Sequence, residues 1–175
     1  MKLIKLWEAD LDRTYALQNS FPKEKNGFIN EACGLSREEF KEYVQRREAN
    51  SRGLQLPDGF VPSTVYILEN EDGEYVGIFN FRHCLNDFLR NGPGHIGYGI
   101  GPKYRGRGYA TEGLRLMLQI AEKEISEDEI FLSVHKDNPA SLKVQLKNGA
   151  YIHGETETEY LTRIPRSGEH RSMGT

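Results

Sequence analysis

Gly99-Ile100-Gly101-Pro102-Lys103-Tyr104-Arg105-Gly106-Arg107-Gly108-Tyr109-Ala110-Thr111 is the stretch that decides the fold of this 175-residue chain. Gly106 and Gly108 allow a sharp backbone turn whose successive N–H groups can point at one anion. Arg105 and Arg107 add charge-assisted donors, and a following helix adds the positive end of its dipole. The stretch predicts a binding site for a phosphate-bearing cofactor. The alternative is a plain strand-to-helix turn with solvated arginines.

The segments on both sides of this turn fit that interpretation. Residues 95–100 include Ile96, Tyr98 and Ile100 between glycines, which is typical of a strand that a ligand or another backbone approaches closely. After the turn, apolar residues recur at steps of three and four, as in an amphipathic helix: Ala110, Leu114, Met117, Leu118, Ala121 and Ile125.

Two other phosphate-binding loops are excluded by their own requirements. A nucleoside triphosphatase loop needs Gly-Lys followed by Ser or Thr, and the chain contains no Gly-Lys dipeptide. A dinucleotide fingerprint starting at Gly106 would need glycine at position 111, where Thr111 stands, and an early position in the chain. Neither nucleotide hydrolysis nor a Rossmann cofactor is expected.

Arg105, Gly108 and Ala110 satisfy in order the signature of the GNAT superfamily of acyl-CoA-dependent N-acyltransferases, which this stretch resembles. A second block, residues 138–150, resembles the last helix of that family, which often opens with Asn and closes with Gly. Here these residues are Asn138 and Gly149. The strand-like segment 130–135 lies between the two blocks, so the order of elements also fits.

The resemblance implies an α/β fold of the α+β type, in which a mixed, mostly antiparallel sheet with splayed central strands is flanked by helices. It implies acetyl-CoA as co-substrate, with pantetheine along residues 98–101 and the pyrophosphate at residues 105–111. The expected cofactor-binding residues are Gly99, Ile100, Gly101, Arg105, Gly106, Arg107, Gly108, Tyr109, Ala110, Thr111, Asn138 and Ser141. Asn138 is equally well explained as a helix N-cap before Pro139.

The implied reaction is direct transfer of the acetyl group to a primary amine of a small molecule or peptide, without a covalent enzyme intermediate. The candidate catalytic residues are His95, as general base, and Tyr98. In a regular strand they face opposite sides, so only a bulge would let them act on one atom. Gln145 stands where many relatives have a tyrosine acid, which leaves the acid undetermined and keeps a non-catalytic acyl-CoA-binding module as the alternative.

Other candidate groups are weaker. His135 and Glu155 are further candidates for the base. Cys84 beside His83 would suggest a thiol nucleophile only if the two side chains met, which neighbours on a strand do not. The five histidines show no metal-ligand spacing, so no metal is expected.

Composition sets further bounds. With 37% hydrophobic residues and a net charge of −3, the chain is expected to form one domain over residues 1–164, with a loose tail over 165–175. No nucleic-acid or membrane partner is expected, and Arg46-Arg47 is interpreted as a solvated helix face. The sequence has two cysteines and shows neither a secretory leader nor a long apolar run, so we expect a cytoplasmic location. A homodimer stays open.

The remaining elements are predicted from capping, periodicity and turn chemistry. Ser36 and Glu39 have capping-box spacing, and Asp10 is a candidate N-cap. We expect helices from Asp10 to about Asn19 and over 37–49, strands over 2–6, 65–68, 75–81 and within 150–164, and irregular chain over 21–35, 50–62 and 85–93.

Overall fold

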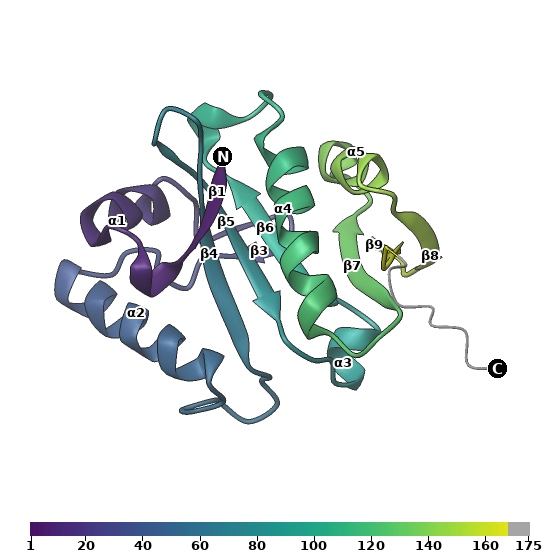
Figure 1. Cartoon of the computed structure of the whole chain (residues 1–175), viewed down its shortest axis with the longest axis horizontal. Coiled ribbons are helices and arrows are strands. Elements are labelled where there is room, and N and C mark those ends of the chain that lie inside the picture. The colour runs from purple at the N-terminus through teal and green to yellow at the C-terminus, as the bar shows by residue number, and fades with distance from the viewer. Residues whose placement is uncertain (168–175) are drawn as a thin grey trace.

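Two antiparallel sheets form the centre of the molecule, which we describe from a computed structural model over residues 1–167 (Figure 1). The first sheet has the order β1 (Lys2–Lys5), β4 (Ser63–Glu69), β5 (Tyr75–Arg82), β6 (Ile96–Ile100). The second has the order β7 (Glu129–His135), β9 (Glu159–Pro165), β8 (Tyr151–Glu155). The strands predicted from alternation and turn chemistry are confirmed.

Strands β6 and β7 are end strands of different sheets, and they meet at one end. There, Gly94 forms an isolated bridge with Leu132, and the His95 amide donates a hydrogen bond of 2.7 Å to the carbonyl of Phe131. Within residues 1–167, no hydrogen-bonded ladder continues this pairing along β6. The predicted splaying of the central strands is confirmed, and it leaves the edge of β6 beside residues 97–100 open.

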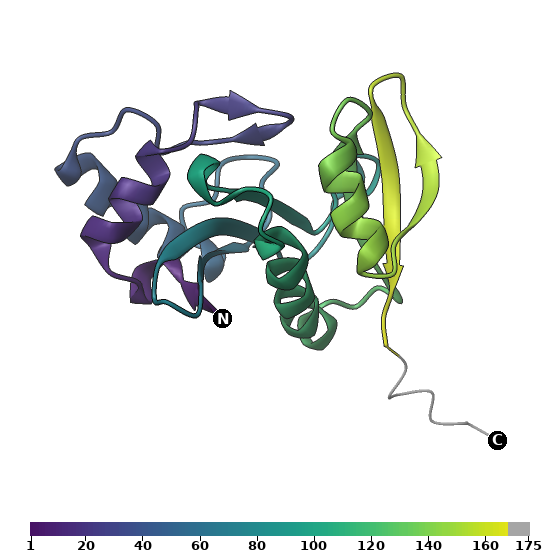
Figure 2. The same cartoon turned by 90° about the horizontal axis from the view of Figure 1, so that it is seen from above.

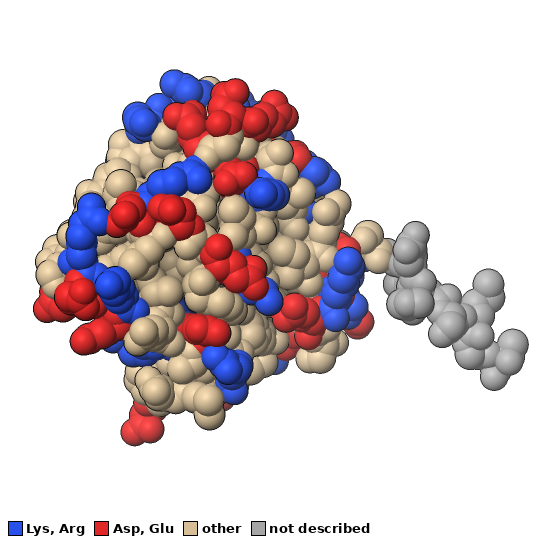
Figure 3. Space-filling view, turned by 60° about the vertical axis from the view of Figure 1, so that its left-hand side comes forward, with Lys and Arg blue, Asp and Glu red and all other residues tan. Residues whose placement is uncertain are grey.

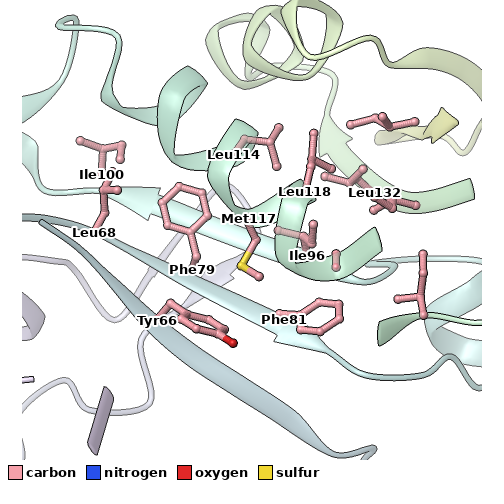
Figure 4. Packing of buried hydrophobic residues seen from close by; sticks show 14 of the residues in the cluster. Tyr66, Leu68, Phe79, Phe81, Ile96, Ile100, Leu114, Met117, Leu118 and Leu132 are labelled. Atoms are coloured by element: carbon pink, nitrogen blue, oxygen red, sulfur yellow. The ribbon is translucent and has the colours of Figure 1, made fainter. Parts of the chain in front are cut away.

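Helices cover both faces of the first sheet. α4 (Tyr109–Glu124) packs its apolar stripe on one face, together with residues of β4, β5, β6 and β7 (Figure 4). α1 (Leu11–Asn19) and α2 (Arg37–Ser51), with the short helix η1 (Leu6–Glu8), cover the other face. Each face therefore has a core of its own, and β6 lies between the two.

The helix starts follow from local capping. The Asp10 carboxylate accepts the Arg13 amide at 2.8 Å, and Ser36 and Glu39 form the reciprocal bonds of a capping box at 3.2 and 2.7 Å. Both predicted helices are confirmed, although α2 runs two residues beyond its expected end.

Two segments predicted as irregular contain short elements. The segment 21–35 holds a hairpin of β2 (Glu24–Lys25) and β3 (Phe28–Ile29), and the segment 85–93 holds α3 (Asp87–Arg90), capped by Asn86. Elements of two or four residues are too short to show a hydrophobic period. In Figure 2 the hairpin lies on the face of the sheet opposite α4, and β3 contacts β6.

The start of the predicted loose tail is held in place. Pro165 is the last residue of β9, and the Arg166 guanidinium donates to the carbonyls of Glu122 and Ile125 at the end of α4. This prediction was wrong for residues 165–167 because these backbone acceptors come from a distant part of the chain. Residues 168–175 lie outside the described part.

Charges of both signs alternate on the face shown in Figure 3, where Lys and Arg side chains are interspersed with Asp and Glu. This face carries no patch of a single sign that would attract a polyanion over a long distance.

Candidate active site

The turn between β6 and α4 leaves a row of backbone donors unused. Gly106 and Gly108 have φ of 76° and 81°, the left-handed region that favours glycine. None of the backbone amides from Arg105 to Thr111 has a hydrogen-bond acceptor among the described residues. Because Gly108 is the N-cap and offers no side chain, the first turn of α4 presents its amides at the positive end of the helix dipole. We call residues 105–111 the cradle.

The two arginines of the cradle differ in their surroundings. The Arg105 Nε donates to the carbonyl of Ile100 at 3.1 Å, which folds the side chain back over the end of β6 and leaves its terminal nitrogens available. Arg107 lines a depression of 290 Å³ together with the carboxylates of Glu71, Asp72 and Glu112, which weaken the positive potential there. Arg105 is therefore the better placed of the two for an anion.

Tyr98 extends from the middle of β6 toward the first turn of α5 (Pro139–Lys147). Its hydroxyl lies 2.8 Å from the Ser141 Oγ, and its ring stacks on Phe79 at 5.4 Å between centroids. Burial raises the pKa of Tyr98, while the hydrogen bond with Ser141 partly opposes the rise. The phenol is thus protonated at neutral pH and lies beside the open edge of β6.

His95 lies just before β6, is fully buried, and has both ring nitrogens engaged. Its Nδ1 accepts the Phe131 amide at 2.9 Å, so its Nε2 carries the hydrogen and donates to Glu127 at 3.2 Å. Burial lowers the pKa of His95. This geometry speaks against the predicted role of general base, because no free nitrogen faces the open edge of β6.

Gln145 and Asn138 hold α5 in place. The Gln145 amide donates to the Ser133 carbonyl at 3.2 Å and accepts the Thr162 hydroxyl at 2.6 Å. The Asn138 Oδ1 accepts the Ser141 amide at 3.2 Å, so the N-cap alternative for Asn138 is confirmed. Gln145 links α5 to the second sheet.

Sequence reasoning missed two arginines on the α1/α2 side of the sheet. Arg47, interpreted as solvated, is 9% exposed and binds Ser63 and Asn80. Its spacing of four residues from the buried Tyr43, three from Val44 and seven from Phe40 was the available signal. Arg82, at the end of β5, was not singled out, and nothing local to its sequence indicated where its side chain lies.

On the second sheet, His135 is half-buried at the end of β7. Its Nε2 lies 3.7 Å from a carboxylate oxygen of Glu159, and its Nδ1 lies 3.9 Å from Asp137. A Cβ built on Gly27 would come within 2.8 Å of this ring, so the β2–β3 hairpin packs directly against it.

A family model described as an acetyltransferase (GNAT) domain matches residues 1–151. The chain belongs to the GNAT acetyltransferase family. It is accordingly an acyltransferase, and enzymes of this family take the acetyl group from acetyl-CoA. No curated protein sequence matches the chain significantly.

Solved structures of GNAT enzymes share this fold. The spermidine N-acetyltransferase of Vibrio cholerae, solved with CoA and spermine, has a TM-score of 0.63 at 17% identity, with 94% of this chain and 95% of that chain covered. The N-acetyltransferase PseH of Campylobacter jejuni has a TM-score of 0.63 at 15% identity, with 95% and 98% covered. A GNAT acetyltransferase of Streptococcus pneumoniae has a TM-score of 0.60 at 17% identity, with 95% and 100% covered.

Over residues 1–167, the helices are all too short or too polar to cross a lipid bilayer.

Proposed function

We propose that residues 1–164 form one N-acetyltransferase domain that transfers the acetyl group of acetyl-CoA directly to a primary amine of a small molecule or peptide. The observation that carries this proposal is the row of unpaired amides from Arg105 to Thr111 at the start of α4. A diphosphate supplies the several acceptors that such a row needs. Arg105 adds a charged donor to the same row.

The open edge of β6 supports the placement of the rest of the cofactor. Gly99, Ile100 and Gly101 lead from this edge into the cradle, and the β7 side of the strand has no partner ladder in the described residues. An extended amide-bearing arm would pair with such an edge as an added strand does. Ser141 and Asn138, at the first turn of α5, border the same edge through Tyr98.

Acetyl-CoA supplies the activated acetyl thioester. Tyr98 acts as general acid, giving its hydroxyl proton to the sulfur as the carbon–sulfur bond breaks, and Ser141 orients the phenol. Tyr98 thereby takes the role that Gln145 cannot perform. With Tyr98 as the acid, the proposal needs no acidic group at position 145.

His135 acts as general base in this proposal. An alkyl amine is mostly protonated at neutral pH, so a base must take its proton before or during attack on the acetyl carbon. Glu159 lies 3.7 Å from the His135 Nε2 and can orient the ring. The proposed direct attack uses no thiol nucleophile. The His83 Nε2, which would have to activate Cys84, is instead hydrogen-bonded with the Thr64 hydroxyl at 2.8 Å.

The test is a CoA-thiol release assay over a panel of primary amines, with wild type and Tyr98→Phe. The variant keeps the stacked ring and loses the hydroxyl, with its proton and its hydrogen bond to Ser141, so kcat should fall about 100-fold or more while CoA affinity stays unchanged. Tyr151→Phe is the matched control. Tyr151 lies on β8, where its hydroxyl binds Glu129, and its replacement should leave kcat unchanged. Equal activity of Tyr98→Phe and wild type would remove Tyr98 from the mechanism.

A further inference from the structure

Two guanidinium groups converge on the α1/α2 side of the first sheet. Arg47 reaches from α2 and donates through Nη2 to Ser63 on β4 and Asn80 on β5, each at 3.1 Å. Arg82 ends β5, pairs in register with Ser63, and donates through Nη1 to the Gly94 carbonyl at 3.0 Å. Arg47 and Arg82 are close enough to repel each other.

This pair borders the part of β6 that has no partner strand on the β7 side among the described residues. Gly97 is the register partner of Asn80, and it directly precedes Tyr98. A Cβ built on Gly97 would lie 3.9 Å from the Arg82 Nη2 and would meet no other atom of residues 1–167 within 4 Å. The Arg82 guanidinium therefore stands beside an uncovered strand position, one residue from the proposed acid.

Within residues 1–167, only one of these two guanidinium groups has a carboxylate beside it. Among the described residues, the only carboxylate within 4 Å of either guanidinium is that of Glu31, 3.6 Å from Arg47. Arg82 has no carboxylate partner there, and the buried Arg47 Nε has no hydrogen-bond partner. Burial, with repulsion from Arg47, lowers the pKa of Arg82 to about 10, so the Arg82 guanidinium is still charged at neutral pH.

A buried cation without a counter-ion is costly, and such arginines normally pair with carboxylates. An oxyanion between the two groups would accept hydrogen bonds from both guanidiniums and neutralise the excess charge. A cationic chain placed there would instead be repelled. The local charge therefore selects against an acceptor with a second ammonium group near its reactive amine.

We propose that the acceptor amine carries an oxyanion, a carboxylate or a phosphate, which Arg82 and Arg47 bind beside Gly97. This inference rests on the proposed function, since it concerns the acceptor of the same reaction. It identifies the substrate class as acidic amines and gives Arg82 the role of a specificity-determining residue.

The test compares four amines of similar length at saturating acetyl-CoA: 2-aminoethyl phosphate, β-alanine, ethanolamine and 1,3-diaminopropane. We expect one of the two acidic amines to exceed ethanolamine and 1,3-diaminopropane in kcat/KM by at least about tenfold, as one charge-assisted contact provides. The preferred acidic amine distinguishes a phosphate from a carboxylate. Binding of each amine to the CoA complex, followed by calorimetry, is a readout independent of turnover.

Arg82→Gln should lower kcat/KM for the preferred acidic amine by about 10- to 100-fold and for ethanolamine by less than about threefold, with CoA affinity unchanged. Arg46→Gln, which removes the same charge from the exposed neighbour of Arg47 on α2, is the control and should change neither value. Arg82→Lys keeps the charge and should restore part of the preference.

Three results would overturn the inference: preference for ethanolamine or 1,3-diaminopropane, an equal loss for all amines in Arg82→Gln, or no binding of either acidic amine to a protein that binds CoA. All three leave CoA binding, and with it the proposed function, intact. If the protein does not bind CoA, both proposals fail together.

Discussion

His95 connects the two sheets through its backbone amide and its imidazole ring. Its backbone amide and its Nδ1 both bind Phe131, at 2.7 and 2.9 Å, so the ring takes the place of a strand acceptor where β6 and β7 begin to separate. The Nε2 hydrogen bond to Glu127 completes this arrangement. The ring must be neutral to accept at Nδ1, which agrees with the lowering of its pKa by burial.

The protonation of His95 should make stability depend on pH. Because the folded-state pKa lies below the ordinary value of 6.5, the unfolded chain binds the proton more readily, and stability is lost as the pH falls below about 6.5. Thermal unfolding from pH 8 to pH 5 should show a falling Tm in wild type and a shallower fall in His95→Gln. The dependence of Tm on pH that remains in the variant comes from other groups such as His83, because burial lowers the pKa of His83 as well. Parallel curves for the two proteins would contradict this role of His95.

At the scale of elements, α5 is attached to the second sheet by Gln145. The side chain bridges the Ser133 carbonyl on β7 and the Thr162 hydroxyl on β9, and both Gln145 and Thr162 are nearly completely buried. The same helix holds Ser141 against Tyr98. The position of the proposed acid therefore depends on this bridge.

Gln145→Leu should lower the free energy of unfolding by about 1–3 kcal/mol, because it leaves a buried hydroxyl and a carbonyl without their partner. Urea unfolding measures this difference. Gln119→Leu, on the exposed face of α4, is the control and should stay within about 0.5 kcal/mol of wild type. Equal losses in the two variants would show that the bridge adds nothing to stability.

Elements with local signals were predictable from the sequence, and contacts between distant elements were not. The Asp10 cap and the Ser36–Glu39 box lie within one turn of the helices they start, and both were found. The burial of Arg47 depends on how α2 packs on β4 and β5, and the engagement of His95 depends on β7, 36 residues away. The charged pair of Arg47 and Arg82 could be seen only once the fold brought them together.

For the cradle, the sequence predicted the turn geometry, because Gly106 and Gly108 do adopt the left-handed conformation. Which residues contact the cofactor stays a prediction. The strongest support for cofactor binding at the cradle is the set of backbone amides without an acceptor among the described residues. These amides stay unpaired because Gly108, the N-cap of α4, has no capping side chain.

At the scale of the whole molecule, the residues of the proposed reaction lie on both faces of the first sheet where it ends at β6. Tyr98 belongs with the core beneath α4, beside α5, whereas Gly99 lies against Phe21 in the core beneath α1 and α2. The Arg47–Arg82 pair also lies on the side of α1 and α2, where Arg47 donates to Ser63 and Asn80. The β2–β3 hairpin lies on the same side of the sheet (Figure 2). We therefore expect the acceptor to approach from the side opposite the proposed acid.

The most direct test of the account is calorimetric titration of CoA into wild type, Gly108→Val and Gly59→Val. Both glycines have left-handed backbone and open space around the Cβ position, with φ of 81° and 80°, so valine strains both turns alike, and only Gly108 lies in the cradle. We predict that wild type and Gly59→Val bind CoA with equal affinity and that Gly108→Val binds at least about tenfold more weakly, which is a loss of about 1.4 kcal/mol. No binding to wild type, or equal affinity in all three proteins, would contradict the account.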